Sequence, residues 1–166
     1  MPNGRTHTLI NTVVVSSATA AAERLGAPLG DPVVVALLAG AVIGTVFITP
    51  DLDMARVRTD ARRAWGPFEV LWWPLLKVSR HRGVSHTYLR GPLIRVAYLA
   101  LMLGLCFLSV RVGWLLTGLP WTPGSWTQVP ARWLRGSTLL CALLGYWIAQ
   151  VLHLLADRIP LTWRRL

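Results

Sequence analysis

Histidine and aspartate, two residue types that bind transition metals, are concentrated in four short segments of this 166-residue chain. All four histidines and three of the seven acidic residues lie in these segments. The segments are "GRTH" (4–7), "PDLD" (50–53), "HRGVSH" (81–86) and "HLLAD" (153–157). Mixed imidazole and carboxylate ligands suit Zn²⁺, Mn²⁺ or Fe²⁺ better than Ca²⁺. The sequence therefore predicts a divalent transition metal as cofactor, provided that the segments meet.

The spacing within two of the segments brings their side chains to a common side. His153 and Asp157 are four residues apart, so both project from one face of a helix. Asp51 and Asp53 alternate, and in an extended segment both carboxylates would face the same side. We therefore expect each pair to act at one place.

The third segment requires a turn. His81 and His86 are five residues apart, which on a helix would separate them by about 140°. They converge only if Gly83 lets the chain turn, so we expect "HRGVSH" to be a loop. Arg80 and Arg82 flank the first histidine and are placed to hold an anionic headgroup.

The composition indicates what must position these segments. The chain is 54% hydrophobic and only 14% charged, with a mean hydropathy of +0.49. Soluble domains carry about 25% charged residues, so the composition favours a membrane protein. The length allows one domain, residues 1–166. In such a chain the net charge of +10 indicates membrane orientation rather than nucleic-acid binding, so no nucleic-acid partner is expected.

We predict an all-α, multi-pass membrane bundle, because a spanning helix needs about 20 apolar residues. Ser, Thr and Ala dilute the first of the four expected transmembrane helices. The polar connection 51–91 should carry a short interfacial helix, with Trp65, Trp72 and Trp73 at the membrane boundary and a break at Pro74. Arg95, inside the third helix, needs a partner or must snorkel. The expected transmembrane helices are residues 8–24, 32–49, 92–117 and 135–157.

The basic residues predict the orientation. Residues 51–95 contain nine Lys and Arg, and the link 25–31 contains none. The positive-inside rule then places the long connection in the cytoplasm. With four helices both termini lie there too, and the four His and Asp segments reach one membrane face.

Six or seven candidate ligands exceed the four of a tetrahedral zinc site. Either two ions bind, or some of these residues support the ligands or act as acid and base. Taken singly, each segment has a simpler explanation. Asp51 and Asp53 would be surface groups beyond a helix end, His153 a hydrogen-bonded histidine of the bundle, and the basic loop a lipid-headgroup site. Their joint placement at one face is what favours a metal site.

The four segments, in this order over nearly the whole chain, resemble those of bacterial membrane-bound metal-dependent hydrolases, a group that includes the LexA-binding, inner-membrane-associated hydrolases. The likeness is strongest to a branch of metal-binding proteins of unknown function whose members open with Gly-Arg-Thr-His. It implies a multi-pass protein of the bacterial cytoplasmic (inner) membrane. Met54 stands where many relatives carry histidine, which leaves one ion or two as alternatives. The implied metal ligands are His7, Asp51, Asp53, His81, His86, His153 and Asp157.

The function favoured by these observations is metal-dependent hydrolysis, in which the ion lowers the pKa of bound water toward about 7 and polarises a phosphoryl or carbonyl oxygen. Asp53 or Asp157 would serve as general base if it holds no metal. Because the site lies at headgroup level, we expect a lipid phosphate, an ester or another small molecule as substrate. The alternatives are a structural metal site or a partner-recruiting role. Metal transport ranks lower, because the predicted spans offer few polar residues at mid-depth.

Overall fold

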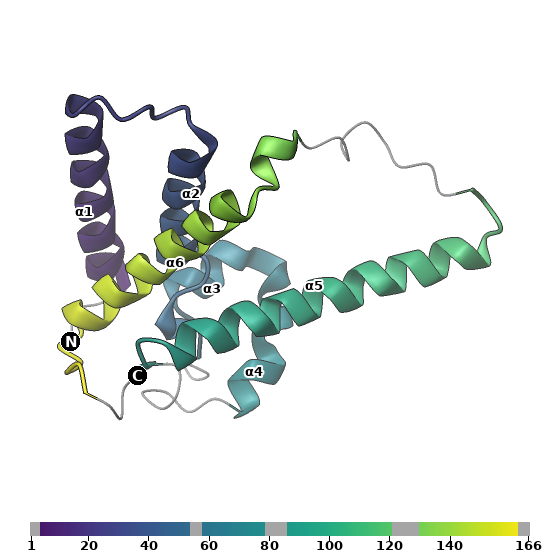
Figure 1. Cartoon of the computed structure of the whole chain (residues 1–166). Coiled ribbons are helices and arrows are strands. Elements are labelled where there is room, and N and C mark those ends of the chain that lie inside the picture. Colours follow the sequence, from purple (N-terminus) through teal and green to yellow (C-terminus); the bar gives the residue numbers. More distant parts are fainter. Residues whose placement is uncertain (1–3, 54–57, 79–85, 121–129, 163–166) are drawn as a thin grey trace.

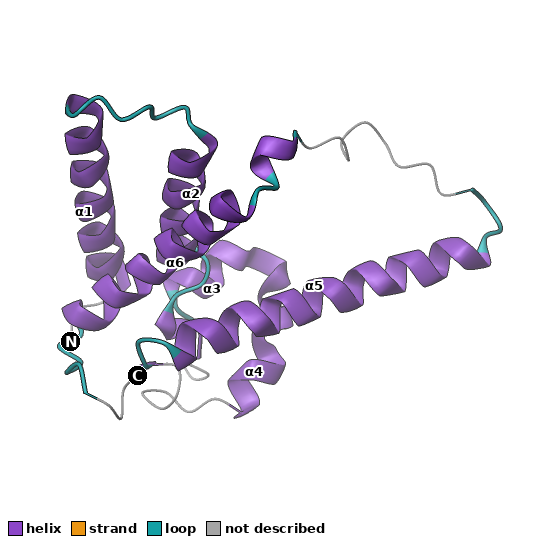
Figure 2. Ribbon diagram, in the orientation of Figure 1, coloured by secondary structure: helices purple, strands orange, loops and turns teal. Residues whose placement is uncertain are grey.

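The computed structural model describes residues 4–53, 58–78, 86–120 and 130–162, and all regular secondary structure in these ranges is helical (Figure 2). The expected all-α class is therefore confirmed. The long helices are α1 (Gly4–Arg24), α2 (Pro32–Val46), α5 (Arg90–Leu116) and α6 (Gly136–Ala156). The short ones are η1 (Pro50–Asp53), α3 (Asp60–Trp65), η2 (Gly66–Trp72), α4 (Trp73–Val78) and η5 (Ala131–Trp133).

Three segments of the described chain are long and apolar enough to cross a membrane. They are Pro32–Leu52, Arg90–Leu116 and Gly136–Ala156, with mean hydropathies of 2.3, 2.2 and 1.9. They correspond to three of the four predicted transmembrane helices. The first predicted stretch also forms a helix, α1, but α1 is not among these candidate spans. Its dilution by small and polar residues explains the difference.

Helix α2 begins where the local sequence caps it and packs closely against α6. Pro32 occupies its first turn, and the Asp31 side chain accepts a hydrogen bond of 2.8 Å from the Val33 amide. A Cβ atom on Gly40 would lie 1.9 Å from the Ala142 carbonyl oxygen of α6. Glycine at this position therefore lets the two backbones touch, as small residues do between membrane helices.

Buried polar side chains tie the long helices together near one end. Arg95 of α5 donates a 2.8 Å hydrogen bond to the Gln150 side chain of α6. Gln150 in turn donates to the carbonyls of Gly44 and Ile48, at 3.0 and 2.8 Å. Arg95 therefore has the protein partner that a cation inside an apolar helix requires. Asn11 of α1 donates to the Ala149 carbonyl of α6 at 3.1 Å.

The second connection folds back onto the bundle and adds an aromatic core. Trp72 is only 1% exposed and packs with Trp65 and Tyr98. Trp72 is therefore a core residue of the protein, and its expected level at a membrane boundary stays a prediction. Pro74 lies in the first turn of α4, next to the boundary at which the 3-10 helix η2 gives way to α4, and its missing N–H costs nothing there. A second break falls at Gly66, whose φ of +55° favours glycine.

Candidate metal centre

Four helix ends that are distant in sequence meet on one side of the molecule. The start of α1, the chain just after α2, the chain just before α5 and the end of α6 lie together (Figure 1). The polar links described above hold α1, α2, α5 and α6 in this arrangement. Five predicted ligands lie at these ends, namely His7, Asp51, His86, His153 and Asp157.

The segment containing Asp51 differs from its prediction. Pro50–Asp53 is a turn of 3-10 helix, so the expectation of an extended segment is wrong. With three residues per turn, positions two apart do not share a face of a 3-10 helix. The turn arises because α2 ends at Val46 and the chain reverses toward α3, whose first turn is capped by the Thr59 hydroxyl.

The five side chains approach one another closely through their ligand atoms. His153 Nε2 lies 3.5 Å from Asp51 Oδ2 and 3.7 Å from Asp157 Oδ2. His86 Nε2 lies 3.9 Å from Asp51 Oδ1 and 3.8 Å from Asp157 Oδ2. His7 Nε2 lies 3.2 Å from Asp157 Oδ1. Every one of these separations joins an imidazole nitrogen to a carboxylate oxygen, which are the two ligand types that the sequence predicted.

Most of these separations are longer than direct hydrogen bonds. N–H···O hydrogen bonds in proteins are typically about 2.7–3.2 Å long, and all but one of the separations exceed that range. Two ligand atoms that are each about 2.0–2.2 Å from a metal lie about 3.0–3.6 Å apart, a range that the separations of 3.2 and 3.5 Å match and the other three slightly exceed. The ligand atoms fall into two groups, each within 4.8 Å, and Asp157 belongs to both. One group adds His7 and His153, and the other adds Asp51 and His86.

Burying these polar and charged side chains costs free energy unless a positively charged group lies among them. His7, His153 and Asp157 are all buried. Apart from the charge contacts just given, the carboxylate oxygens of Asp157 and Nε2 of His153 have no hydrogen-bond partner among the described residues. Buried polar atoms are almost always satisfied, and a buried carboxylate needs a positive partner. A divalent ion between these side chains meets that need, so the residues present fit a metal.

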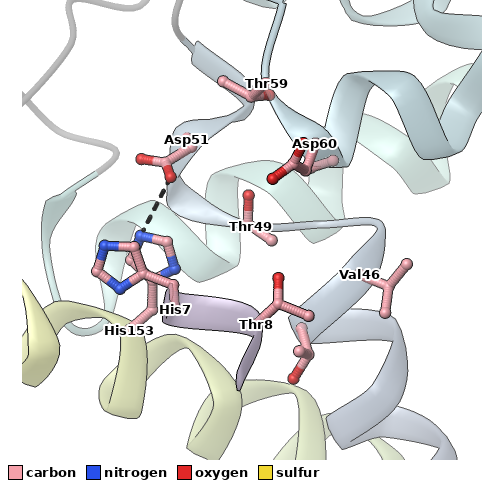
Figure 3. A pocket seen from close by; sticks show the side chains of 10 residues that line it. His7, Thr8, Val46, Thr49, Asp51, Thr59, Asp60 and His153 are labelled. Carbon is pink, nitrogen blue, oxygen red and sulfur yellow. Dashed lines mark ion pairs between the residues drawn. The ribbon is translucent and has the colours of Figure 1, made fainter. Parts of the chain in front are cut away.

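The rings of His7 and His153 stack, with centroids 4.0 Å apart and planes inclined by 14° (Figure 3). Burial, followed by the nearby His153, lowers the pKa of His7 below the ordinary histidine value, against the opposing effect of Asp157 and Asp51. The imidazole of His7 is therefore neutral at neutral pH, which is the form that binds metals.

A cavity of about 140 Å³ opens beside the His and Asp cluster (Figure 3). His7, His153 and Asp51 form one part of its lining. Hydroxyl groups and one further carboxylate form much of the rest. These residues are Thr8, Thr45, Thr49, Thr59 and Asp60. The cavity therefore offers hydrogen-bonding groups for a small molecule next to the candidate ligands.

The sequence did not single out the lining of this cavity. Asp60 precedes an arginine-rich stretch and is also 3.6 Å from Arg63, so it resembled an ordinary surface residue. Thr45 and Thr49, four residues apart near the polar end of α2, were the one available signal. Only the fold shows that these threonines face the same space as His7.

Four predicted site residues are not placed. His81, Arg80 and Arg82 lie outside the described residues, and of Asp53 only the backbone, in η1, is described. Their roles as ligand, headgroup-binding group or base stay predictions. Asp157, the other predicted base, lies among three histidines, a position suited to a ligand.

Comparisons with known proteins bear on the same chemistry. A family described as "Uncharacterized metal-binding protein (DUF2227)" matches residues 2–166. A curated "Uncharacterized protein" of Aquifex aeolicus (strain VF5) is 38% identical over 60 residues. That alignment covers 36% of this chain and 41% of the Aquifex protein, so the likeness spans less than half of either. No solved structure matches.

Proposed function

This chain belongs to the family of uncharacterized metal-binding proteins, and on that basis we propose that it is a membrane-embedded metal-dependent hydrolase acting on a lipid phosphate or ester. The observation that carries the proposal is the convergence of three histidine nitrogens and two carboxylates to separations of 3.2–3.9 Å. The ligands proposed are His7, Asp51, His86, His153 and Asp157.

The donor set supports Zn²⁺, Mn²⁺ or Fe²⁺ as the cofactor. Three imidazoles and two carboxylates are borderline ligands that suit these ions. Asp157 contributes one oxygen toward His7 and the other toward His86 and His153. Because Asp157 belongs to both ligand groups, the five side chains would hold either one ion or two.

The position of the cluster at the ends of the candidate spans supports a membrane location. Asp51 lies at the end of the candidate span Pro32–Leu52, and Asp157 directly follows the candidate span that ends at Ala156. His86 lies four residues before α5 begins. The cluster therefore lies where the apolar segments stop, which is headgroup level in a bilayer. The nine basic residues of 51–95 favour the cytoplasmic face of a bacterial inner membrane.

A bound divalent ion would supply Lewis acidity and lower the pKa of water in the site. Side chains of the protein would orient the substrate and accept the proton. The hydroxyls of Thr49 and Thr59 in the cavity would orient a phosphate or ester by hydrogen bonding. Asp60 lines the same cavity without belonging to either ligand group, so it is placed to accept a proton from water as general base. The predicted headgroup contacts of Arg80 and Arg82 remain part of this proposal.

The main competing function is a structural metal site. Structural zinc sites are closed by protein ligands, whereas catalytic sites keep an open position. The cavity that adjoins His7, Asp51 and His153 provides room for a reactant, which favours catalysis. A structural site, whose ion is enclosed by protein ligands, does not require an adjoining space of about 140 Å³.

The test combines metal analysis with turnover on the same detergent-purified preparations. Wild type, His153→Ala and Asp51→Ala are compared by elemental analysis, and hydrolysis is measured with p-nitrophenyl phosphate, a p-nitrophenyl ester and phosphatidic acid. Glu23→Gln, which removes an exposed carboxylate at the far end of α1, is the matched control. We expect metal in wild type and control, and loss in both alanine variants. Equal metal in all four proteins would refute the metal centre, and metal-replete wild type without turnover would leave the structural role.

A further inference from the structure

The cavity at the candidate metal centre continues into a groove between α1 and α2. A second cavity of about 140 Å³ lies between these helices and shares Thr45 and Val46 with the first. A third, of about 440 Å³, shares Thr8 with the first and Thr12 with the second. The second cavity therefore adjoins the first between α1 and α2, whereas the third lies between α1 and Asp60 of α3.

The lining of this groove becomes less polar with distance from the candidate metal centre. At one end lie His7, Asp51 and the threonines of the cavity. Beyond Thr45 the lining combines the apolar Val15, Ala41, Val42 and Val46 with Asn11, Thr12 and Ser16. Such a gradient fits an amphiphile with its polar end at the metal centre.

The groove exists because α1 and α6 engage different parts of α2. Helix α6 packs against the glycine face of α2 so closely that their backbones touch. Helix α1 lies beside α2 (Figure 1), and Asn11 ties it to Thr45 of α2 at 3.3 Å and to Ala149 of α6. Beyond this tie, Thr12 and Ser16 of α1 face a space rather than a packed partner.

We infer that this groove, the α1–α2 groove, binds one acyl chain of a membrane glycerophospholipid whose headgroup reaches the threonine-lined cavity. The inference rests on the proposed function, because it takes α2 to span a membrane. Ala41, Val42 and Val46 belong to the candidate span Pro32–Leu52, where the surrounding solvent is hydrocarbon. From Thr8 to Ser16 the α1 side of the groove is about 12 Å long, enough for the part of a chain nearest its headgroup.

The experiment uses the metal-loaded full-length protein in phosphatidylcholine vesicles that contain phosphatidylglycerol with a diazirine in its acyl chain. After irradiation, adducts are mapped by mass spectrometry. The measured quantity is the ratio of adducts on residues 41–46 of α2 to adducts on α5, the candidate span with the smallest buried share, 6%. We expect adducts to concentrate on 41–46, although α5 offers far more exposed apolar surface.

Two tryptophan variants separate the groove from general lipid contact. Ser16→Trp fills the groove, while Ser17→Trp places the same side chain one position away, at another exposed residue that does not line it. Ser16→Trp should lower the adduct ratio about tenfold, since excluding even two methylene groups from an apolar site weakens binding by that order. Ser17→Trp should leave it unchanged. Equal ratios in both variants, or adducts mainly on α5 in wild type, would overturn the inference.

Metal content measured on the same samples separates this inference from the function on which it rests. Groove-selective adducts in a protein that binds no metal would refute the proposed function and retain the lipid site. Bound metal with adducts spread evenly over the spans would retain the metal centre and refute the groove as a lipid site. Crosslinks from the groove to a second copy of the chain would also refute it.

Discussion

The Nε2 atom of His7, near the beginning of the sequence, lies 3.2 Å from Oδ1 of Asp157, nine residues before the last one. The contact joins the first turn of α1 to the residue that caps α6. It closes the cluster, because Asp157 reaches His86 and His153 through its other oxygen. Asp157 is thus the one carboxylate that belongs to both ligand groups among the described residues.

Asp157→Ala should therefore remove more metal than His7→Ala. Loss of a shared ligand affects both groups, whereas His7 belongs to one. We expect the metal content of Asp157→Ala to fall to about a tenth or less of wild type, since even residues that only support ligands are worth about 10–100-fold in affinity. Elemental analysis at fixed free metal checks this. A smaller loss in Asp157→Ala than in His7→Ala would contradict the shared role.

Asp60→Asn should separate binding from catalysis. Asparagine retains the shape of the side chain but cannot accept a proton, so bound metal should stay at the wild-type level while turnover falls by about 10²–10⁴-fold. Asp157→Asn should lose metal and turnover together. The measurement is metal occupancy and turnover with whichever of the three probe substrates wild type hydrolyses. Full turnover by Asp60→Asn would exclude Asp60 as the base.

Gly40→Ala should destabilise the bundle. Its Cβ would lie 1.9 Å from the backbone oxygen of Ala142, so α2 and α6 must separate, at a cost of about 1–3 kcal/mol. Gly104→Ala in α5 is the matched control, because nothing lies within 4 Å of its Cβ position and removing a helical glycine stabilises by about 0.5–1 kcal/mol. Thermal unfolding in detergent, followed by circular dichroism, should give opposite shifts of Tm. Shifts of the same sign would argue against the close backbone contact.

Gln150→Leu should destabilise the protein through the polar links of α2, α5 and α6. The substitution removes the acceptor of Arg95, a hydrogen bond to a charged group worth about 1.5–3 kcal/mol, and the donors to Gly44 and Ile48. Ser109→Ala in α5 removes only an exposed hydrogen bond to the same helix and should change stability little. The free energy of unfolding of both variants, measured in a denaturant series, tests this prediction. Equal stability of the two variants would show that the buried links contribute nothing.

The link between α1 and α2 should lie on the opposite side of the membrane from α3. Residue 28 precedes the candidate span Pro32–Leu52, and residue 60 follows it. Reporter fusions at these two positions should report opposite compartments, with residue 60 in the cytoplasm because of the basic residues around it. The same compartment for both would remove α2 as a span and the proposed headgroup level of the site with it.

The sequence by itself determined the long helices and the residue types of the candidate ligands. Both are local properties. By forming a helix, a run of apolar residues satisfies the hydrogen bonds of its own backbone N–H and C=O groups. A spacing of four residues places His153 and Asp157 on one helix face wherever that helix packs. These predictions needed no knowledge of neighbours, and the structure confirms the helices and brings five of the seven predicted ligands near one another.

Only the tertiary structure decided how these pieces meet. The glycine contact of Gly40 with α6 sets how close the helices come, and the 3-10 turn of Pro50–Asp53 aims Asp51. The inward packing of Trp72 and the exposure of Asp60 to the cavity depend equally on distant segments. Each outcome is a competition among contacts between residues far apart in the chain. Local propensity does not encode such contacts, so the cavity and its groove could not be predicted from the sequence.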